Sequence, residues 1–290
     1  MDARTRMAEL ARRFQAWDLT PLSAYDDLVS SKDDAGRFFA PYVPLVGSQY
    51  DKYKVLIYGT AQNIGRCTDL RKDLSANSDK LVWRLYYSMK FDKDGFQVPL
   101  PYNEVPIEPF REGIVPALAG LFILVRFGET ISNLQDVQEH VAVSNFCKFS
   151  LSHGARDMNP NSLAQGEAYW DMNAELVREE VALLNPEHVI IAFNYERNPL
   201  AWRAIKKVWP TKELIMVNDP AWIKRGARGC LKPGGSWHKR VASEKTPEII
   251  EAYLPQISRP DSTYVDGFRD LAKTYLMFYL LDWQTKYQGA

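Results

Sequence analysis

The sequence predicts an α/β fold, a three-layer α/β/α arrangement around a central, mostly parallel four-stranded sheet. Two observations predict it. Short, continuously apolar runs, typical of strands that are covered on both faces, alternate along the chain with longer stretches of helical periodicity. Several of the runs also end in polar residues, as strands that border a ligand crevice do. The strands are expected at residues 55–58, 141–144, 189–193 and 214–217.

The apolar spacing places the helices between and beyond these strands. They are expected at residues 4–17, 80–89, 114–127, 164–184 and 264–287. Asn185 and Pro186 end the fourth of them, and Pro116 predicts a kink in the third. Residues 95–109 are expected to be loop, and residues 20–51 loop with a short helix.

The length and the spacing suit a single domain, residues 1–290, of the α/β/α kind. Three parts are expected to add to its core: a helical extension at residues 1–50, an insertion at residues 66–108 and the C-terminal helix at residues 264–287.

The composition excludes several classes of protein. The 36 basic and 36 acidic residues balance, so no overall charge attracts this chain to nucleic acid or to a membrane. Its cysteines, Cys67, Cys147 and Cys230, lie far apart, which argues against a disulfide framework or a four-thiolate metal site. Without a signal peptide or an apolar run long enough to span a bilayer, we expect a cytoplasmic protein.

Three of the predicted strands end in polar residues that can face one crevice. These are residues 60–63, Asn145 and the pair Asn218 and Asp219. Gly59 lacks a side chain, so a ligand can approach the backbone there, and the Asn145 amide suits the Watson–Crick edge of a nucleobase. The alternative is that these residues only form turns, as Asn and Asp commonly do.

A local excess of positive charge follows the last strand. Residues 224–240 contain six Lys or Arg and no acid, with Trp222 and Trp237 close by or within the segment. Basic groups combined with aromatic rings suit contact with phosphates and stacking on bases. The alternative is a solvated loop, because most basic runs are solvated.

Together these motifs resemble the uracil-DNA glycosylase superfamily. The first family motif is similar to Gly59-Thr60-Ala61-Gln62-Asn63, and the last to Asp219-Pro220-Ala221. The middle region of the thermostable bacterial branch is similar to Ser144-Asn145-Phe146-Cys147-Lys148 and the strand that follows Asn185-Pro186. Pro109-Phe110 resembles the segment whose Phe stacks on the flipped base in that branch.

The resemblance implies a monofunctional DNA glycosylase. It would flip a modified base out of double-stranded DNA and hydrolyse the N-glycosidic bond, leaving an abasic site. The residues implied to bind the base are Asn145, Phe110, Gly59, Thr60 and Ala61. Those implied to bind DNA are Lys148, Trp222, Ile223, Lys224, Arg225 and Arg228, with Trp222 or Ile223 filling the gap that the flipped nucleotide leaves.

The chain departs from the family pattern at the residues that carry the chemistry. Ala61 stands where many members have a water-activating Asp or Asn, and Asp219 stands where the family has His. We therefore expect Asn63, with Gln62 second, to position water or stabilise the sugar, and Asp219 to stabilise the sugar cation or activate water. The Fe–S cysteines of the thermostable branch are missing, so no Fe–S cluster, other cofactor or metal is expected.

These departures and the aromatic-rich insertion at residues 66–108 indicate a substrate bulkier than uracil. The expected substrate is glucosylated hydroxymethylcytosine in phage DNA, which makes the chain a monomeric antiviral enzyme with no membrane partner. Three alternatives stay open. They are a catalytically inactive DNA-binding module of the same fold, a uracil-excising repair enzyme, and a small-molecule or nucleotide enzyme that uses the same crevice.

Overall fold

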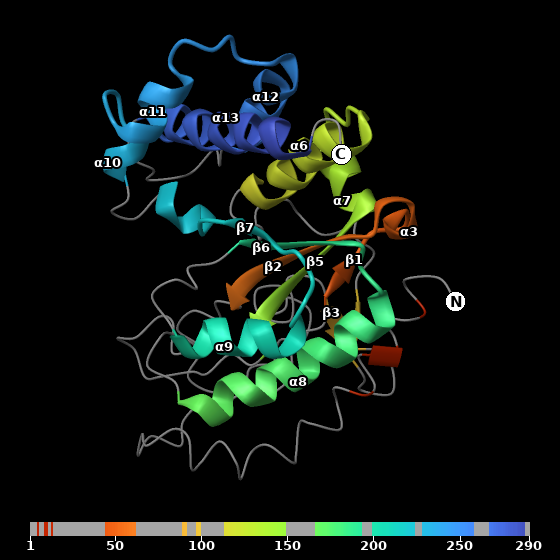
Figure 1. Ribbon diagram of the computed structural model, residues 1–290. Coiled ribbons are helices and arrows are strands. Elements are labelled where there is room, and N and C mark those ends of the chain that lie inside the picture. Colours follow the sequence, from red (N-terminus) through yellow and green to blue (C-terminus); the bar gives the residue numbers. More distant parts are fainter. Residues whose placement is uncertain are drawn as a thin grey trace, which may run out of the picture.

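The computed structural model of the chain describes residues 44–61, 89–91, 97–99, 113–148, 166–192, 199–223, 228–257 and 267–287, together with Thr5, Glu9, Leu10 and Arg13 (Figure 1). At residues 60–61, 89–91, 97–99, 221–222 and 228 it describes the backbone alone. The four isolated N-terminal residues all have helical backbone, and Arg13 pairs with Glu9 one turn away. Their helical conformation agrees with the helix expected at residues 4–17.

The core of the fold is a five-stranded mixed sheet with the order β1-β5-β2-β6-β7. Its strands are β1 (Leu45–Val46), β2 (Val55–Ala61), β5 (Val141–Cys147), β6 (His188–Ala192) and β7 (Ile215–Val217). The last four are parallel to one another, and β1 pairs with β5 in the antiparallel direction. The expectation of four strands is therefore wrong by one. Two residues are too short for a periodic signal, so the extra edge strand has no mark in the sequence.

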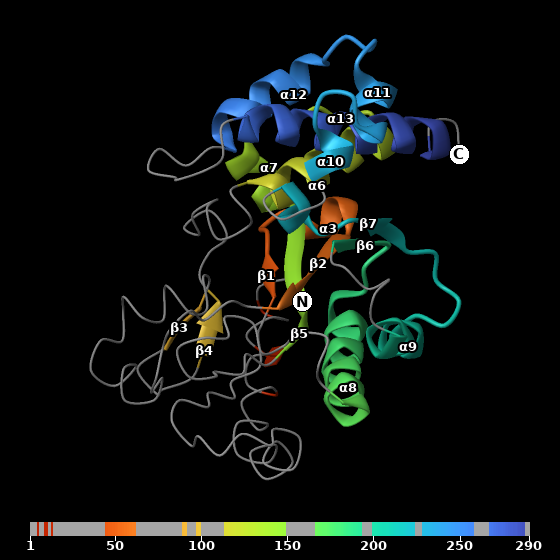
Figure 2. The same cartoon turned by 90° about the vertical axis from the view of Figure 1, so that its left-hand side faces the viewer.

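Helices cover both faces of this sheet, as the α/β class requires (Figures 1 and 2). One face carries α8 (Glu167–Leu184) and α9 (Pro199–Val208), and the other carries α6 (Ile114–Phe127) with α13 (Phe268–Tyr287) behind it. The shorter helices are α3 (Tyr50–Tyr53), α7 (Leu134–His140), η3 (Pro220–Ile223), α10 (Arg228–Leu231), α11 (Ser236–Val241), α12 (Glu248–Tyr253) and η4 (Leu254–Gln256). In the described part of the chain, no helix has the length and apolar character needed to cross a membrane.

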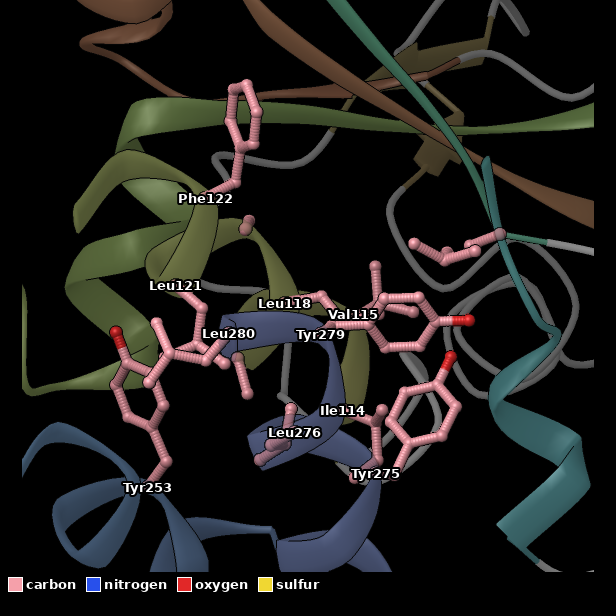
Figure 3. Packing of buried hydrophobic residues seen from close by; sticks show 14 of the residues in the cluster. Ile114, Val115, Leu118, Leu121, Phe122, Tyr253, Tyr275, Leu276, Tyr279 and Leu280 are labelled. Atoms are coloured by element: carbon pink, nitrogen blue, oxygen red, sulfur yellow. The ribbon is translucent and has the colours of Figure 1, made fainter. Parts of the chain in front are cut away.

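Helix α6 is the centre of the hydrophobic core, because it lies between the sheet and α13. Most of its side chains are buried, and Figure 3 shows three of them, Ile114, Leu118 and Phe122, among the packed residues of the core. Its bounds agree with the expected helix, but the expected kink at Pro116 does not follow. Pro116 is the third residue of the helix, where a backbone N–H has no acceptor within the helix, so the missing N–H costs nothing.

The other predicted helices and loops agree with the structure only in part. Helix α8 ends where Asn185 adopts a left-handed conformation before Pro186, as the sequence indicates. The expected helix at residues 80–89 is wrong at Met89, which begins strand β3 (Met89–Phe91), and residues 80–88 lie outside the described residues. The expected loop at residues 95–109 contains strand β4 (Gln97–Pro99), which pairs with β3. Helices α7, α9 and α12 were not predicted.

Candidate functional site

The carboxyl ends of the four parallel strands all lie on the same side of the sheet, which faces the viewer in Figure 2. We call this side, where the strands end, the carboxyl edge. From β2 the chain leads to β5 on one side, and from β5 it crosses to β6 on the other side. The topological switch point therefore lies between β2 and β6. In open α/β sheets, ligands bind at such a point, beyond the carboxyl ends of the strands.

Gly59 and Asn145 are direct neighbours at this edge. They are paired across β2 and β5, and the Asn145 side-chain oxygen lies 2.8 Å from the position that a Cβ atom on Gly59 would take. Both residues are half-buried. Their position in the strand alternation places them on the same face as Val55 and Ile57, which pack into the α6 and α13 core. The structure thus brings together two of the residues predicted to bind a base.

The turn after β7 is fixed by two tyrosines of α13. The backbone N–H of Asn218 donates to the Tyr279 hydroxyl at 2.6 Å, and its side-chain amide donates to the same oxygen at 3.1 Å. The Tyr275 hydroxyl donates to the Asn218 carbonyl oxygen. Figure 3 shows both hydroxyl groups pointing toward the chain between β7 and η3. Asp219, the next residue, is therefore held at the edge of the sheet by α13.

The negative charge of Asp219 acts on the Tyr275 hydroxyl. Burial, the neighbouring Tyr279 and then Asp219 raise the pKa of Tyr275 well above its ordinary value, so Tyr275 stays a neutral hydrogen-bond donor. Sequence reasoning missed both tyrosines. Their spacing of four residues in an apolar helix is the only mark they leave in the sequence.

Asn145 lies on β5 and Asp219 lies in the turn that follows β7, and these two strands are three positions apart in the sheet. At the usual spacing of neighbouring strands, that separation is roughly 14 Å. The two side chains therefore cannot contact the same small group. A ligand that contacts both must extend along the edge, as a nucleotide with its flanking phosphates does.

The opposite face of the same strands holds a buried polar network. Lys148 follows β5 directly, and its ammonium group donates to Ser144 Oγ at 2.6 Å and to Glu180 of α8. Tyr58 donates to the other oxygen of Glu180 at 2.6 Å. All four side chains are buried, with the Lys148 and Glu180 side chains fully excluded from solvent. Asn173 of α8 accepts from the Lys148 backbone N–H and so closes the network.

Burial has the largest effect on the pKa values of Lys148 and Glu180. It lowers the pKa of Lys148 and raises the pKa of Glu180, while their attraction for each other opposes both shifts. The expected contact between Lys148 and a DNA phosphate is therefore wrong in this structure, because the ammonium group is turned inward and already bound. Glu180 was missed, although a Glu within the apolar stripe of a helix signals a buried partner.

The basic segment, residues 224–240, is not a plain loop where the structure describes it. It contains α10 and α11, and Trp237 stacks on Phe278 of α13 with 3.8 Å between the ring centroids. Arg240 lies 4.8 Å from the centroid of the same Phe278 ring. The described part of this segment therefore packs on α13. The Trp237 ring, which was expected to stack on bases, packs on Phe278 instead.

The other predicted site residues fall into three groups. Ile223 is 1% exposed in the hydrophobic core, so the prediction that it fills the gap left by a flipped nucleotide is wrong in this conformation. Thr60, Ala61, Trp222 and Arg228 are placed by their backbone only. The remaining predicted residues lie outside the described residues; they are Gln62, Asn63, Phe110, Lys224 and Arg225.

Two cavities found among the described residues lie away from this edge. One, of about 360 Å³, lies at the amino ends of β6 and β7 and includes Arg126, His188 and Lys212 in its lining. The other, of about 350 Å³, lies between α11 and α13 and includes His238 and Met277. Within the same described ranges, no group of His, Cys, Asp and Glu residues is arranged to hold a metal ion.

Comparisons with protein-family models, with curated proteins and with solved structures found no match to this chain. The resemblance to the uracil-DNA glycosylase superfamily therefore rests on the short motifs alone. It stays a prediction.

Proposed function

We propose that this chain is a DNA glycosylase of the uracil-DNA glycosylase type, which extrudes a modified base and hydrolyses its N-glycosidic bond. The observation that carries the proposal is the pairing of Gly59 with Asn145 at the carboxyl edge of the sheet. Because Gly59 has no side chain, the half-buried Asn145 amide fits beside β2 at the carboxyl edge, where it can form hydrogen bonds with the edge of a flat base.

The proposed chemistry is a hydrolysis. Water adds to C1′ of the sugar as the bond from C1′ to the base nitrogen breaks, and the electron pair of that bond leaves with the base. The proton lost by water balances the negative charge of the departing base. Asn63 or Gln62 would position the water, and Asp219 would stabilise the positive charge on the sugar. No cofactor takes part in this scheme.

The proposed substrate is a base bulkier than uracil, with glucosylated hydroxymethylcytosine in phage DNA as the specific candidate. Ala61 and Asp219 replace the residues with which family members act on uracil. A chain that keeps the crevice but changes these groups is expected to act on a different base.

Base release from matched oligonucleotides tests the proposal. Duplexes carrying uracil, cytosine, hydroxymethylcytosine or its glucosylated form are incubated with the protein, the free base is identified by mass spectrometry, and alkaline cleavage reports abasic sites. Release of the glucosylated base supports the proposal in full, and release of uracil alone supports the family and rejects the substrate. A protein that binds these duplexes and releases no base is the non-catalytic module.

Two variants connect the activity to the site. Asn145→Ala removes the amide that reads the base, and Asn63→Ala removes the candidate water-positioning group. Both are expected to lose base release, and Asn63→Ala is expected to keep its affinity for DNA. Ser144→Ala is the matched control, because Ser144 is next to Asn145 on β5 but faces the buried network on the other side of the sheet. Folded Ser144→Ala protein should release the base at the wild-type rate.

A further inference from the structure

Helix α9 presents a large aromatic ring on its outer face. Trp202 is 39% exposed, and among the described large apolar side chains only Phe127, at 37%, is comparably exposed. Single exposed apolar residues are common, so exposure alone carries no functional meaning. The charges around Trp202 and its place in the fold give it one.

The charges on this face of α9 are unevenly balanced. Arg203 pairs with Glu167 at 2.5 Å, and Lys207 pairs with Asp171 at 2.5 Å, so α8 neutralises both cations. The Lys206 ammonium group instead lies over the Trp202 ring, 4.9 Å from the ring centroid, in a cation–π contact. No carboxylate of the described residues is paired with it. The outer face of α9 therefore carries an indole ring and, over it, a cation that no carboxylate of the described residues neutralises.

The fold places this pair beside the proposed crevice. Because α9 follows β6, its N-terminal turn lies near the carboxyl edge of the sheet, and Trp202 is the fourth residue of the helix. Figure 2 looks onto this edge and shows α9 end-on at one side, with α10 of the basic segment on the other side of the sheet. Phe127, at the end of α6, is followed by the left-handed Gly128 and takes part in a ring contact with His188, the first residue of β6, at the opposite edge.

We propose that Trp202 and Lys206 bind a DNA strand on the α9 side of the crevice, opposite the basic segment. The indole ring stacks on an unpaired base next to the extruded nucleotide, and the ammonium group contacts the adjacent phosphate. An aromatic ring beside a cation is the combination that binds nucleic-acid strands without reading their sequence. This inference rests on the proposed function for the identity of the partner.

Binding of a fluorescently labelled duplex that carries one abasic-site analogue, followed by anisotropy, tests the inference. Trp202→Ala is expected to weaken binding by roughly tenfold, the usual loss when one stacked base loses its aromatic partner, and Trp202→Phe is expected to keep most of the affinity. Lys206→Ala is expected to make the plot of log affinity against log salt concentration less steep, by the amount that one phosphate contact contributes to the slope. Phe127→Ala is the matched control and should bind as the wild type does.

The outcomes separate this inference from the proposed function. If the wild type binds and Trp202→Ala binds equally well, the inference is overturned while the glycosylase proposal stands. If Trp202→Ala binds more weakly than Phe127→Ala but the wild type releases no base from any duplex, the inference is supported and the glycosylase proposal fails. If the wild type binds no DNA, both are overturned. Thermal melting of each variant confirms that it is folded.

Discussion

The side-chain oxygen of Asn145 lies 2.8 Å from the place where Gly59 would carry a Cβ atom, so the two residues fit together only because one of them is glycine. Real Cβ contacts do not occur at this distance. The position of the Asn145 amide at the carboxyl edge of the sheet therefore depends on its neighbour across the strand pair.

Gly59→Ala is expected to separate activity from stability. The added methyl group meets the end of a half-buried side chain that can rotate away, so the free energy of unfolding should change by less than about 1 kcal/mol. Displacing the amide should lower base release by about 10- to 100-fold, the cost of one lost hydrogen bond to the base. Urea unfolding and the base-release assay measure the two effects.

Gly120→Ala provides the contrast for that variant. A Cβ atom at Gly120 of α6 would lie 2.0 Å from the Tyr253 hydroxyl oxygen, inside the packed core. Overpacking of this kind costs about 1–3 kcal/mol, so Gly120→Ala should be clearly less stable than Gly59→Ala. Equal activity of Gly59→Ala and the wild type would contradict the role assigned to Asn145.

The Lys148–Glu180 pair should contribute to stability as a unit. Lys148→Met leaves the Glu180 carboxyl buried without its cation and is expected to lower the free energy of unfolding by about 3–5 kcal/mol. Adding Glu180→Leu should recover part of this loss, although Tyr58 and Ser144 still lose the oxygen to which they donate. A double-mutant cycle measured by urea unfolding gives the coupling between the two residues.

An exposed ion pair supplies the control for this cycle. Lys207 and Asp171 are 2.5 Å apart, but each side chain keeps more than a third of its surface exposed. Lys207→Met is therefore expected to cost less than about 1 kcal/mol. A loss of similar size from Lys148→Met would show that the buried pair is not important for stability.

Cys147 should make the protein less stable in alkali. Burial raises the pKa of its thiol from 9.0 to about 12. Between these two values the unfolded chain loses the thiol proton and the folded protein keeps it, so rising pH favours unfolding. The contribution is fully present below pH 9 and is lost as the pH rises to about 12, with a slope of about 1.4 kcal/mol per pH unit.

Comparison of two cysteine variants isolates this effect. Cys147→Ala should unfold with a weaker dependence on pH above pH 9 than the wild type, because the ionising group is gone. Cys230→Ala should change the dependence less, since Cys230 is only partly buried. Parallel pH profiles for the wild type and Cys147→Ala, measured by urea unfolding, would reject the assignment.

The sequence predicted the parallel strands and the long helices because their signals are local. Residues 55–58 are continuously apolar, and the helix at residues 114–127 was placed with the bounds that the structure has. The antiparallel β1 was missed because its two residues carry no period. Short helices such as α7 were missed because they contain too few turns to show a clear apolar period.

The candidate site was predicted less completely, because its arrangement depends on residues far apart in the sequence. Asn145 and Gly59 follow directly from the strand ends. Lys148 was predicted to bind a DNA phosphate, but its side chain is buried against Glu180, which lies 32 residues later in the sequence. No local pattern could show that Tyr275 and Tyr279 hold the turn after β7, since they lie 57 and 61 residues beyond Asn218 in the sequence.

These tyrosines carry the last prediction. Tyr279→Phe removes the oxygen that accepts the Asn218 backbone N–H at 2.6 Å, and an unsatisfied N–H of this kind costs about 1–3 kcal/mol. Asn218 is half-buried, so water can replace part of the lost bond and the cost should be at the lower end. Because Asp219 follows in the chain, the variant should also lower base release.

Tyr253→Phe distinguishes the two effects of that substitution. Its hydroxyl donates to the Ile131 carbonyl oxygen at 2.5 Å, away from the carboxyl edge, so its loss should reduce stability and leave base release by the folded protein unchanged. Tyr279→Phe should reduce both. If the two variants lose stability equally and both retain full activity, the turn after β7 does not position Asp219 for catalysis, and the role proposed for Asp219 must be given up.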